Sequence, residues 1–403
     1  MTGQKARKSK FLIFLFNAYM AFWALYLVHW SGAKITPIDA VSNALLAFNL
    51  LVSAVLFLRV NFTMRLQVFL RVLNWAIVFF SIYGIASILG GAEHYVSEFA
   101  DKKINNGSYL IGILRSFLPI YAFYFFSIRS ILSKKMLRIW ALVLIGVSCA
   151  SYFLVIVNNP RLINGIGSYT NNSSYDILGV MPLIFAFHDR KWLQYFLCIL
   201  CTVLILLGMK RGPMIIASIL IIYLVFVNFR HARGWRKFLA ILVSAAFISG
   251  MGYYAVNLYE KSEIMQKKMS RTMAGDSSGR DTLYSTYWNH FKEEGDPVKF
   301  FFGNGADSTL DIGFNYAHND WFEILTNNGL VGVILFAVMW ICFWKAIRNV
   351  GVHALRTILT AFYVVLLMQT FFSMSYSCWP TAATMCIGYC LSFAGRRSGY
   401  SLS

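Results

Sequence analysis

The sequence predicts an all-α, polytopic integral membrane protein, and three observations point to this class. Of the 403 residues, 58% are hydrophobic and only 13% are charged. Apolar runs recur along the chain with a length of about 20 residues, which an α-helix needs to cross the hydrocarbon core of a bilayer. Short segments rich in Lys and Arg separate these runs. We therefore expect a single transmembrane domain, residues 1–403, and no separate soluble domain.

The apolar runs predict about twelve membrane-spanning helices. In chain order they cover residues 11–31, 39–58, 66–90, 109–128, 137–157, 173–187, 193–209, 213–229, 238–257, 323–344, 357–376 and 379–394. The first run lacks a small-residue cleavage site, and a second apolar run follows it. We therefore expect a retained helix and not a removed signal peptide.

The distribution of Lys and Arg among the connections predicts the orientation. Basic connections such as "RSILSKKMLR" and "RHARGWRK" alternate with much less basic ones. Because Lys and Arg concentrate in cytoplasmic loops, both termini are expected in the cytoplasm. The net charge of +19 is then mainly a sign of topology, with a secondary attraction to anionic lipid headgroups. We exclude nucleic acid as a partner.

The cysteines give little sign of metal or redox chemistry. All seven lie in or beside apolar runs, where a thiol behaves as a small apolar group. Cys198 and Cys201 form a C-x-x-C pair, but no second pair and no nearby histidine accompany them. No DxD motif and no cluster with metal-ligand spacing occurs in the predicted outer loops, so we expect no metal.

One long connection, residues 258–322, lies on the predicted outer face. It holds more than half of the acidic residues of the chain. Helical periodicity in "YEKSEIMQKKMSRTM" and "RDTLYSTYWNHFKE" predicts two amphipathic helices. Because binding and catalytic groups are often mounted on loops that a rigid scaffold holds, we expect the functional residues here.

Basic residues near the outer ends of predicted spans are candidates for binding an anion. Lys210 and Arg211 lie in a short outer turn, against the positive-inside bias, and an Arg at the centre of a membrane helix costs about 2.5 to 3.5 kcal/mol on insertion scales. Either an anionic ligand or lipid phosphates would stabilise the pair. Arg115 lies about 9 Å inside its span. It either reaches back to the interface or lines a polar cavity.

Two further elements of the long connection carry candidate residues. Arg280 follows small residues in "SSGRDTLYSTYW". In "FFGNGADST", Gly303 and Gly305 permit backbone conformations that other residues resist. No strand precedes this glycine pair, so a dinucleotide-binding turn is excluded.

The segment "HNDWFEILTNNGLVG" at 318–332 places polar residues at the mouth of a membrane helix. The spacing of Asp320 and Glu323 resembles a capping box, so a helix is expected to begin near residues 319–321. His318 then precedes a helix N-terminus, where free N–H groups and the helix dipole favour an anion. Considered alone, a histidine at such a junction is more often a cap or a surface residue.

Two glycines follow in the same segment. Gly329 and Gly332 share one face of the expected helix. They permit either close contact with another helix or a local break in this one.

The spacing of His318, Asn319, Gly329 and Gly332 resembles the signature of the O-antigen ligase and O-antigen polymerase superfamily, which are bacterial envelope glycosyltransferases. Four other segments are similar to elements of the same family: "GMKRGPMIIASIL", "GSYTNNSSYDILGVMPLIF", "SSGRDTLYSTYW" and "FFGNGADS". The resemblance covers roughly residues 160–340. Lys210 stands where the family usually has Ser, and Met181 where it has Leu, so the subfamily stays open.

The resemblance implies an enzyme of the bacterial cytoplasmic (inner) membrane whose active site faces the periplasm or cell exterior. Its donor would be an undecaprenyl-diphosphate-linked glycan, and it would need neither a nucleotide sugar, nor a metal, nor another cofactor. The acceptor would be a glycan or lipid A core. Association with other polysaccharide assembly proteins is compatible with this role.

Residue roles follow from this resemblance together with the chemistry. Arg211 and Arg280, helped by Lys210 and Arg115, would stabilise negative charge on the leaving diphosphate. His318 is the candidate general base or acceptor-positioning group. The remaining candidates for substrate binding are Asn319, Asp320, Glu323, Gly303 and Gly305. Glu323 has two alternatives, capping the helix or orienting His318.

Three functions within the family and one of another class stay open at this point. A polymerase that extends the glycan is favoured by the acids at the third and sixth positions of "HNDWFE". A ligase would transfer the finished glycan to lipid A core, and a relative would transfer it to a protein hydroxyl. A transporter or lipid-linked sugar flippase is the alternative of another class, although no internal repeat between the halves supports it.

Overall fold

The computed structural model is helical, and it describes residues 2–28, 39–91, 94–95, 103–104, 107–158, 171–231, 279–313 and 315–394, with scattered positions between 234 and 270. The chain forms two compact units, each assembled from segments that are distant in sequence. The first unit comprises Met1–Ala47, Ser133–Asp276 and His353–Val365, and the second comprises Phe48–Leu132, Ser277–Val352 and Leu366–Ser403. That the whole chain acts as a single transmembrane domain stays a prediction.

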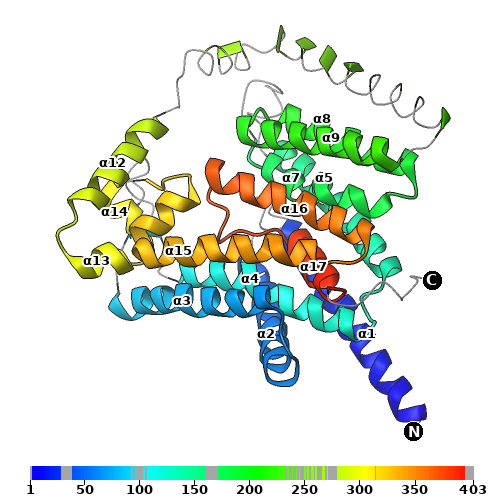
Figure 1. Ribbon diagram of the computed structural model, residues 1–403, viewed down its shortest axis with the longest axis horizontal. Coiled ribbons are helices and arrows are strands. Elements are labelled where there is room, and N and C mark those ends of the chain that lie inside the picture. Colours follow the sequence, from blue (N-terminus) through cyan, green and yellow to red (C-terminus); the bar gives the residue numbers. More distant parts are fainter. Residues whose placement is uncertain are drawn as a thin grey trace. The chain divides into compact units, whose positions relative to one another are not determined.

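The first unit is built around α5 (Lys134–Val157) and α8 (Lys191–Leu207). Helix α5 packs on α1 (Thr2–Val28), α7 (Ser174–Val180) and the 3₁₀ helix η3 (Met181–Phe187). Helix α8 packs on α7, on η3 and on α9 (Arg211–His231), which runs beside it in Figure 1. Two further helices, α2 (Asp39–Thr63) and α16 (His353–Phe372), pass from this unit into the other.

The second unit has α4 (Ser108–Ile128) as its most buried long helix. Helix α4 packs on α17 (Thr381–Leu391) and on α3 (Val68–Gly90), and α3 in turn packs along α15 (Asp320–Arg348; Figure 1). Three short helices precede α15: α12 (Arg280–Glu293), α13 (Pro297–Phe302) and α14 (Thr309–Gly313). A two-stranded antiparallel pair, β1 (His94–Tyr95) and β2 (Lys103–Ile104), contacts α14 through β1.

Eleven of the twelve predicted spans coincide with helices of the described chain, and the remaining one, 238–257, lies largely outside the described residues. Among the described residues, eight helices are long and apolar enough to cross a membrane: α1, α2, α3, α4, α5, α9, α15 and α16. Three others are apolar but shorter: α7 with η3, α8 and α17. The all-helical membrane class is thereby confirmed, while the number of spans and the orientation stay predictions.

The predicted span at 173–187 is not one regular α-helix. It is α-helical to Val180 and continues as a 3₁₀ helix from Met181. Pro182 explains the change, because proline has no N–H for an α-helical hydrogen bond and its ring collides with the preceding turn. The two amphipathic helices predicted in the long connection have different outcomes. The second is α12, and the first lies largely outside the described residues.

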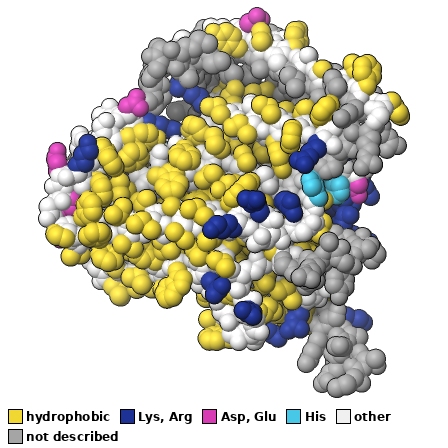
Figure 2. Space-filling view, viewed as in Figure 1, with side chains coloured by type: hydrophobic (Ala, Val, Ile, Leu, Met, Phe, Trp, Pro, Cys, Tyr) yellow, Lys and Arg dark blue, Asp and Glu magenta, His cyan; other side chains and the backbone are white. Residues whose placement is uncertain are grey.

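Large apolar side chains cover the outer surface of the spanning helices. On α3, Trp75 is 70% exposed and Leu89 is 81% exposed, and Ile334 and Ile341 on α15 are also exposed. In Figure 2, hydrophobic side chains cover most of the surface in the region where Figure 1 shows α3 and α15. An apolar surface of this extent is typical of contact with lipid tails.

Candidate functional site

Helix α15 begins at Asp320, within the range expected from the sequence, but its cap differs from the predicted one. Asn319 has an extended backbone, and its Oδ1 accepts hydrogen bonds from the backbone N–H groups of Trp321 at 2.9 Å and Phe322 at 3.4 Å. Asn319 is therefore the N-cap. The predicted capping box between Asp320 and Glu323 is wrong, because Glu323 lies one residue beyond the position that could reach back to this cap.

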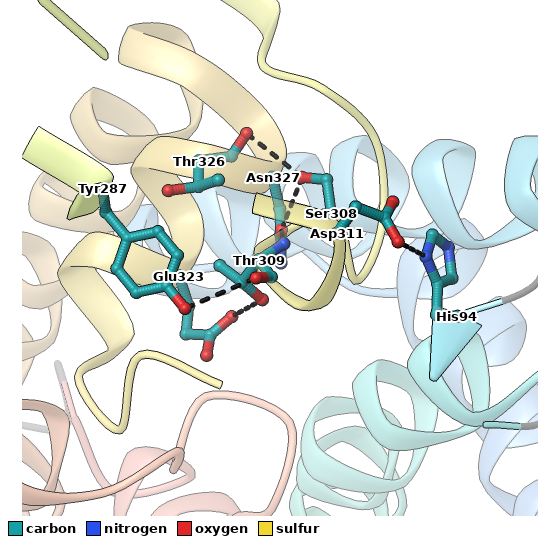
Figure 3. A network of polar contacts seen from close by, with 8 residues as sticks. All are labelled: His94, Tyr287, Ser308, Thr309, Asp311, Glu323, Thr326 and Asn327. Atoms are coloured by element: carbon teal, nitrogen blue, oxygen red, sulfur yellow. Dashed lines mark hydrogen bonds and ion pairs between the residues drawn. The ribbon is translucent and has the colours of Figure 1, made fainter. Parts of the chain in front are cut away.

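Glu323 instead connects two loops. Its side chain is 1% exposed; one carboxylate oxygen accepts from the backbone N–H of Ala317 at 2.5 Å, and the other accepts from the Thr309 hydroxyl at 2.7 Å. Figure 3 shows Glu323 and Thr309 facing each other across this contact. Ala317 immediately precedes His318, in the segment 315–319 that we call the histidine loop. Glu323 therefore holds the histidine loop against the start of α14.

Asp320 makes a second connection, to the segment between α16 and α17. Its carboxylate is fully buried and accepts from the backbone N–H of Ser375 at 2.7 Å and from the Ser375 hydroxyl at 2.5 Å. Asp320 and Glu323, both in the first turn of α15, therefore have hydrogen-bond partners in the second unit. Their predicted contact with a sugar stays a prediction, and so does that of Asn319.

His318 itself adopts a left-handed backbone conformation, with φ of 52°, and its side chain is half-buried. Such a conformation is uncommon outside glycine and is tolerated where the surrounding structure enforces it. The hydrogen bond to Ala317 on one side and the cap at Asn319 on the other supply that constraint.

A break in α15 follows two turns later. Gly329 has φ of 66° and ψ of −166°, far from helical values. The carbonyl groups that the break leaves without helical partners accept hydrogen bonds from the glycine-rich turn: Asn304 N–H donates to Thr326 O and Gly305 N–H donates to Asn327 O, both at 3.0 Å. The two alternatives for this glycine, a break and a close contact, thus occur together.

Side chains complete the join between the broken helix and the turn. The Asn327 Oδ1 accepts from the Ser308 hydroxyl at 2.9 Å and from the Thr309 N–H at 3.2 Å, as Figure 3 shows for the serine. The Asn328 Oδ1 accepts from the Tyr109 hydroxyl of α4 at 3.1 Å. Sequence reasoning singled out neither asparagine, although two consecutive amides inside an apolar run were a signal.

Helix α12 brings Arg280 into the same unit. Tyr284 stacks on Phe322 in the first turn of α15, with ring centroids 4.9 Å apart. Tyr287 is buried, and its hydroxyl donates to the Asn315 carbonyl at 2.5 Å. The helix that begins with half-buried Arg280 is therefore anchored to both ends of the histidine loop.

Arg115 lies inside the second unit. Its side chain is 9% exposed, and its guanidinium donates to the Ser377 carbonyl at 3.3 Å and contacts Cys378 Sγ at 3.2 Å. These partners belong to the same inter-helix segment that Asp320 binds through Ser375. Contact between Arg115 and a diphosphate stays a prediction.

Lys210 and Arg211 belong to the first unit. Arg211 opens α9, and both side chains are half-buried. The preceding turn is held by Asn171, whose N–H donates to the Gly208 carbonyl at 2.9 Å. The asparagine-rich segment and the "KRG" turn, far apart in sequence, therefore meet. That this basic pair and His318 act on one substrate stays a prediction.

The structure accounts for the predicted glycines in terms of packing. A Cβ on Gly303 would meet the Asn327 carbonyl at 2.5 Å, and one on Gly332 would meet the Asn328 Cβ at 2.5 Å. Gly305, with φ of 109°, faces open space. Substrate binding by Gly303 and Gly305 stays a prediction.

Comparison with known proteins gives a match to one family model over part of the chain. Residues 196–337 match a family model described as O-antigen ligase. The matched region runs from α8 into α15 and includes Lys210, Arg211, Arg280 and His318. A search of curated proteins gave no match.

Proposed function

Because residues 196–337 match a family model described as O-antigen ligase, we propose that this protein is a membrane glycosyltransferase that polymerises undecaprenyl-diphosphate-linked oligosaccharide repeat units of O-antigen, capsule or exopolysaccharide on the outer face of the cytoplasmic membrane. The family match is the observation that carries this proposal. The anchored loop around His318 supports it, since a transferase must hold its reacting groups in a fixed geometry.

In the proposed reaction, an acceptor hydroxyl attacks the anomeric carbon of the donor. The new glycosidic bond forms as the bond from that carbon to the diphosphate oxygen breaks, and undecaprenyl diphosphate leaves with the electron pair. Arg211 and Arg280 stabilise the charge that develops on the leaving oxygen, with Lys210 and Arg115 in support. Fixed cations at such a point are usually the largest catalytic contribution.

His318 takes the proton of the acceptor hydroxyl, as a general base whose unperturbed pKa lies near working pH. Glu323 and Asn319 hold the two ends of its loop. Neither a metal nor a nucleotide sugar takes part in this proposal. The bilayer holds the undecaprenyl chain, and the diphosphate lies at the interface.

The alternative within the superfamily is a ligase that transfers the glycan to lipid A core. The motif around His318 is shared by both activities, so the acceptor decides between them.

Reconstitution tests the proposal. The full-length protein is placed in liposomes with a lipid-linked repeat unit alone, and the products are separated by length. A ladder of glycans supports the polymerase. Transfer only after lipid A core is added would instead support the ligase. If no glycosidic bond forms with any acceptor, the glycosyltransferase proposal is wrong.

A further inference from the structure

A carboxylate outside the predicted catalytic set stands out in the turn between α13 and α14. Asp307 is 7% exposed, and its backbone is left-handed, with φ of 58°. Left-handed backbone costs an aspartate energy, and such strain persists where the surrounding structure enforces it, often at functional sites. The turn follows Gly303 and Gly305, whose segment is bonded to the broken part of α15.

Within the described part of the chain, no hydrogen bond or ion pair engages the Asp307 carboxylate. Burying an unpaired charge is costly, and proteins normally pair such groups with a cation or with hydrogen-bond donors. The Asp307 carboxylate is therefore available to accept hydrogen bonds from a bound ligand.

The position of Asp307 is nevertheless well defined. Its own carbonyl accepts from the Leu310 N–H at 3.0 Å. The next two residues, Ser308 and Thr309, are bonded to Asn327 and Glu323 of α15. A functional side chain held by its neighbours in this way is preorganised for binding.

Asp307 also lies near the histidine loop. Glu323 joins Thr309, two residues after Asp307, to Ala317, one residue before His318. The same carboxylate thus positions the Asp307 turn and the predicted catalytic base.

The groups around Asp307 suit a hydroxylated ligand. Tyr109, Tyr316 and Tyr376 interact with it electrostatically, which places three aromatic side chains with hydroxyl groups near the carboxylate. His94 is 6% exposed; its Nδ1 lies 3.0 Å from Asp311, and its Nε2 has no hydrogen-bond partner in the described residues. Carboxylates, imidazoles and tyrosines all hydrogen-bond to hydroxyl groups, and tyrosine rings pack against apolar faces.

We propose that Asp307 is the hydroxyl-binding carboxylate of an acceptor-saccharide subsite, accepting hydrogen bonds from sugar hydroxyl groups beside His318. This inference rests on the proposed function, because it assigns the acceptor of that reaction. The ligand's hydroxyl groups would donate the hydrogen bonds that none of the described residues donates to this carboxylate.

The protonation state of Asp307 gives the subsite a pH signature. Burial raises its pKa to about 6, with Asp311 adding to the rise and His94 opposing it. Among the described residues, the titratable groups that interact with it are His94, Asp311, Tyr109, Tyr316, Tyr376 and Glu323. Since the ionised form accepts the stronger hydrogen bonds, acceptor affinity should fall as the pH drops through about 6.

The test compares Asp307→Asn with the wild-type protein, both full length and reconstituted. The acceptor probe is a soluble glycoside of the repeat unit without diphosphate, and undecaprenyl diphosphate is the probe for the donor side. We expect the variant to raise the KM for the glycoside by about 10- to 100-fold, as for loss of a hydrogen bond to a charged group. Its affinity for undecaprenyl diphosphate and its unfolding temperature should not fall. The loss of acceptor affinity that the wild-type protein shows as the pH drops through about 6 should be absent in the variant.

Glu293→Gln is the matched control, because Glu293 is an exposed acid at the end of α12. It should behave as wild type. An Asp307→Asn protein whose KM for the glycoside stays within about twofold of wild type would overturn the inference. So would a parallel loss of donor affinity and thermal stability, which would make Asp307 a structural residue.

Direct binding separates this inference from the proposed function. If wild-type protein forms no glycosidic bond yet binds the glycoside more tightly than Asp307→Asn does, the transferase proposal fails and the saccharide subsite stands. If transfer occurs and the two proteins bind the glycoside equally, only the subsite is wrong.

Discussion

Gly303 and Gly329 touch backbone to backbone: a Cβ built on Gly329 would lie 2.5 Å from the Gly303 nitrogen. Both glycines have positive φ, 77° and 66° respectively. The contact joins the turn before α14 to the break in α15, and so sets the positions of Asp307 and of the carbonyl groups at Thr326 and Asn327.

Replacing Gly329 with alanine should destabilise the second unit. The substitution adds a side chain at a left-handed position and forces two backbones apart, so we expect a loss of at least about 1 to 3 kcal/mol. Thermal unfolding in detergent measures it. Gly295→Ala is the control, because a Cβ there meets nothing within 4 Å. Equal unfolding temperatures for the two variants would refute the role given to this contact.

Glu323 should tolerate glutamine but not alanine. A glutamine side chain can accept from the Ala317 N–H and donate to the Thr309 hydroxyl, which keeps both connections. Alanine leaves the Ala317 N–H buried and unpaired, at a cost of about 1 to 3 kcal/mol. We expect Glu323→Gln to keep most of the kcat and Glu323→Ala to lose at least about tenfold.

The comparison of kcat and KM for the two Glu323 variants identifies the role of this residue. If Glu323→Gln is as impaired as Glu323→Ala, the carboxylate charge itself is needed, and the positioning role is wrong.

Removing the proposed reacting groups should abolish transfer without unfolding the protein. Arg211→Ala, Arg280→Ala and His318→Ala should each lower kcat by about 10²- to 10³-fold, the size typical of losing one preorganised electrostatic or proton-transfer group. Initial rates of glycan extension provide the measurement. Arg348→Ala, at the exposed end of α15, should leave the rate unchanged. Near-normal turnover by Arg211→Ala would disprove its assignment to the diphosphate.

Asp307 should make stability depend on pH. Its pKa is about 6 in the folded protein and about 3.9 in an unfolded chain. A raised pKa favours folding while the group is protonated, so this contribution is complete below about pH 4 and is lost as the pH rises through about 6. The change is on the order of 2 to 3 kcal/mol.

Unfolding temperatures of wild type and Asp307→Asn between pH 4 and pH 7.5 measure this dependence. The difference between the two proteins should shift in favour of the variant as the pH rises. A constant difference across this range would contradict the raised pKa.

Much of the helical architecture follows from local pattern. The starts and ends of α3, α4 and α9 lie within a few residues of the apolar runs that predict them. In a bilayer, each spanning segment must satisfy its backbone hydrogen bonds within its own helix. Each span is therefore predictable from the apolar run that forms it. The exception at Pro182 is also local, and the proline itself was visible in the sequence.

The candidate site was predicted in part. The predicted start of the helix after His318 is confirmed, because a polar segment before an apolar run is a local feature. The catalytic role of His318 stays a prediction. The sequence interpretation missed both partners of Glu323. The Ala317 N–H and the Thr309 hydroxyl come within hydrogen-bonding distance of its carboxylate only when α14 packs on α15. It also missed Asp307, one acid among many in the long connection.

By itself, the sequence determined the membrane class, the apolar segments and the residues that resemble a glycosyltransferase family, because each depends on composition or on spacing along the chain. Only the tertiary structure decided that Gly329 breaks α15, that Glu323 joins two loops, and that Asp307 is buried with no hydrogen bond to its carboxylate from the described residues. These three properties depend on which groups meet across many residues of chain. Burial and hydrogen-bond pairing belong to that folded arrangement and not to any one segment.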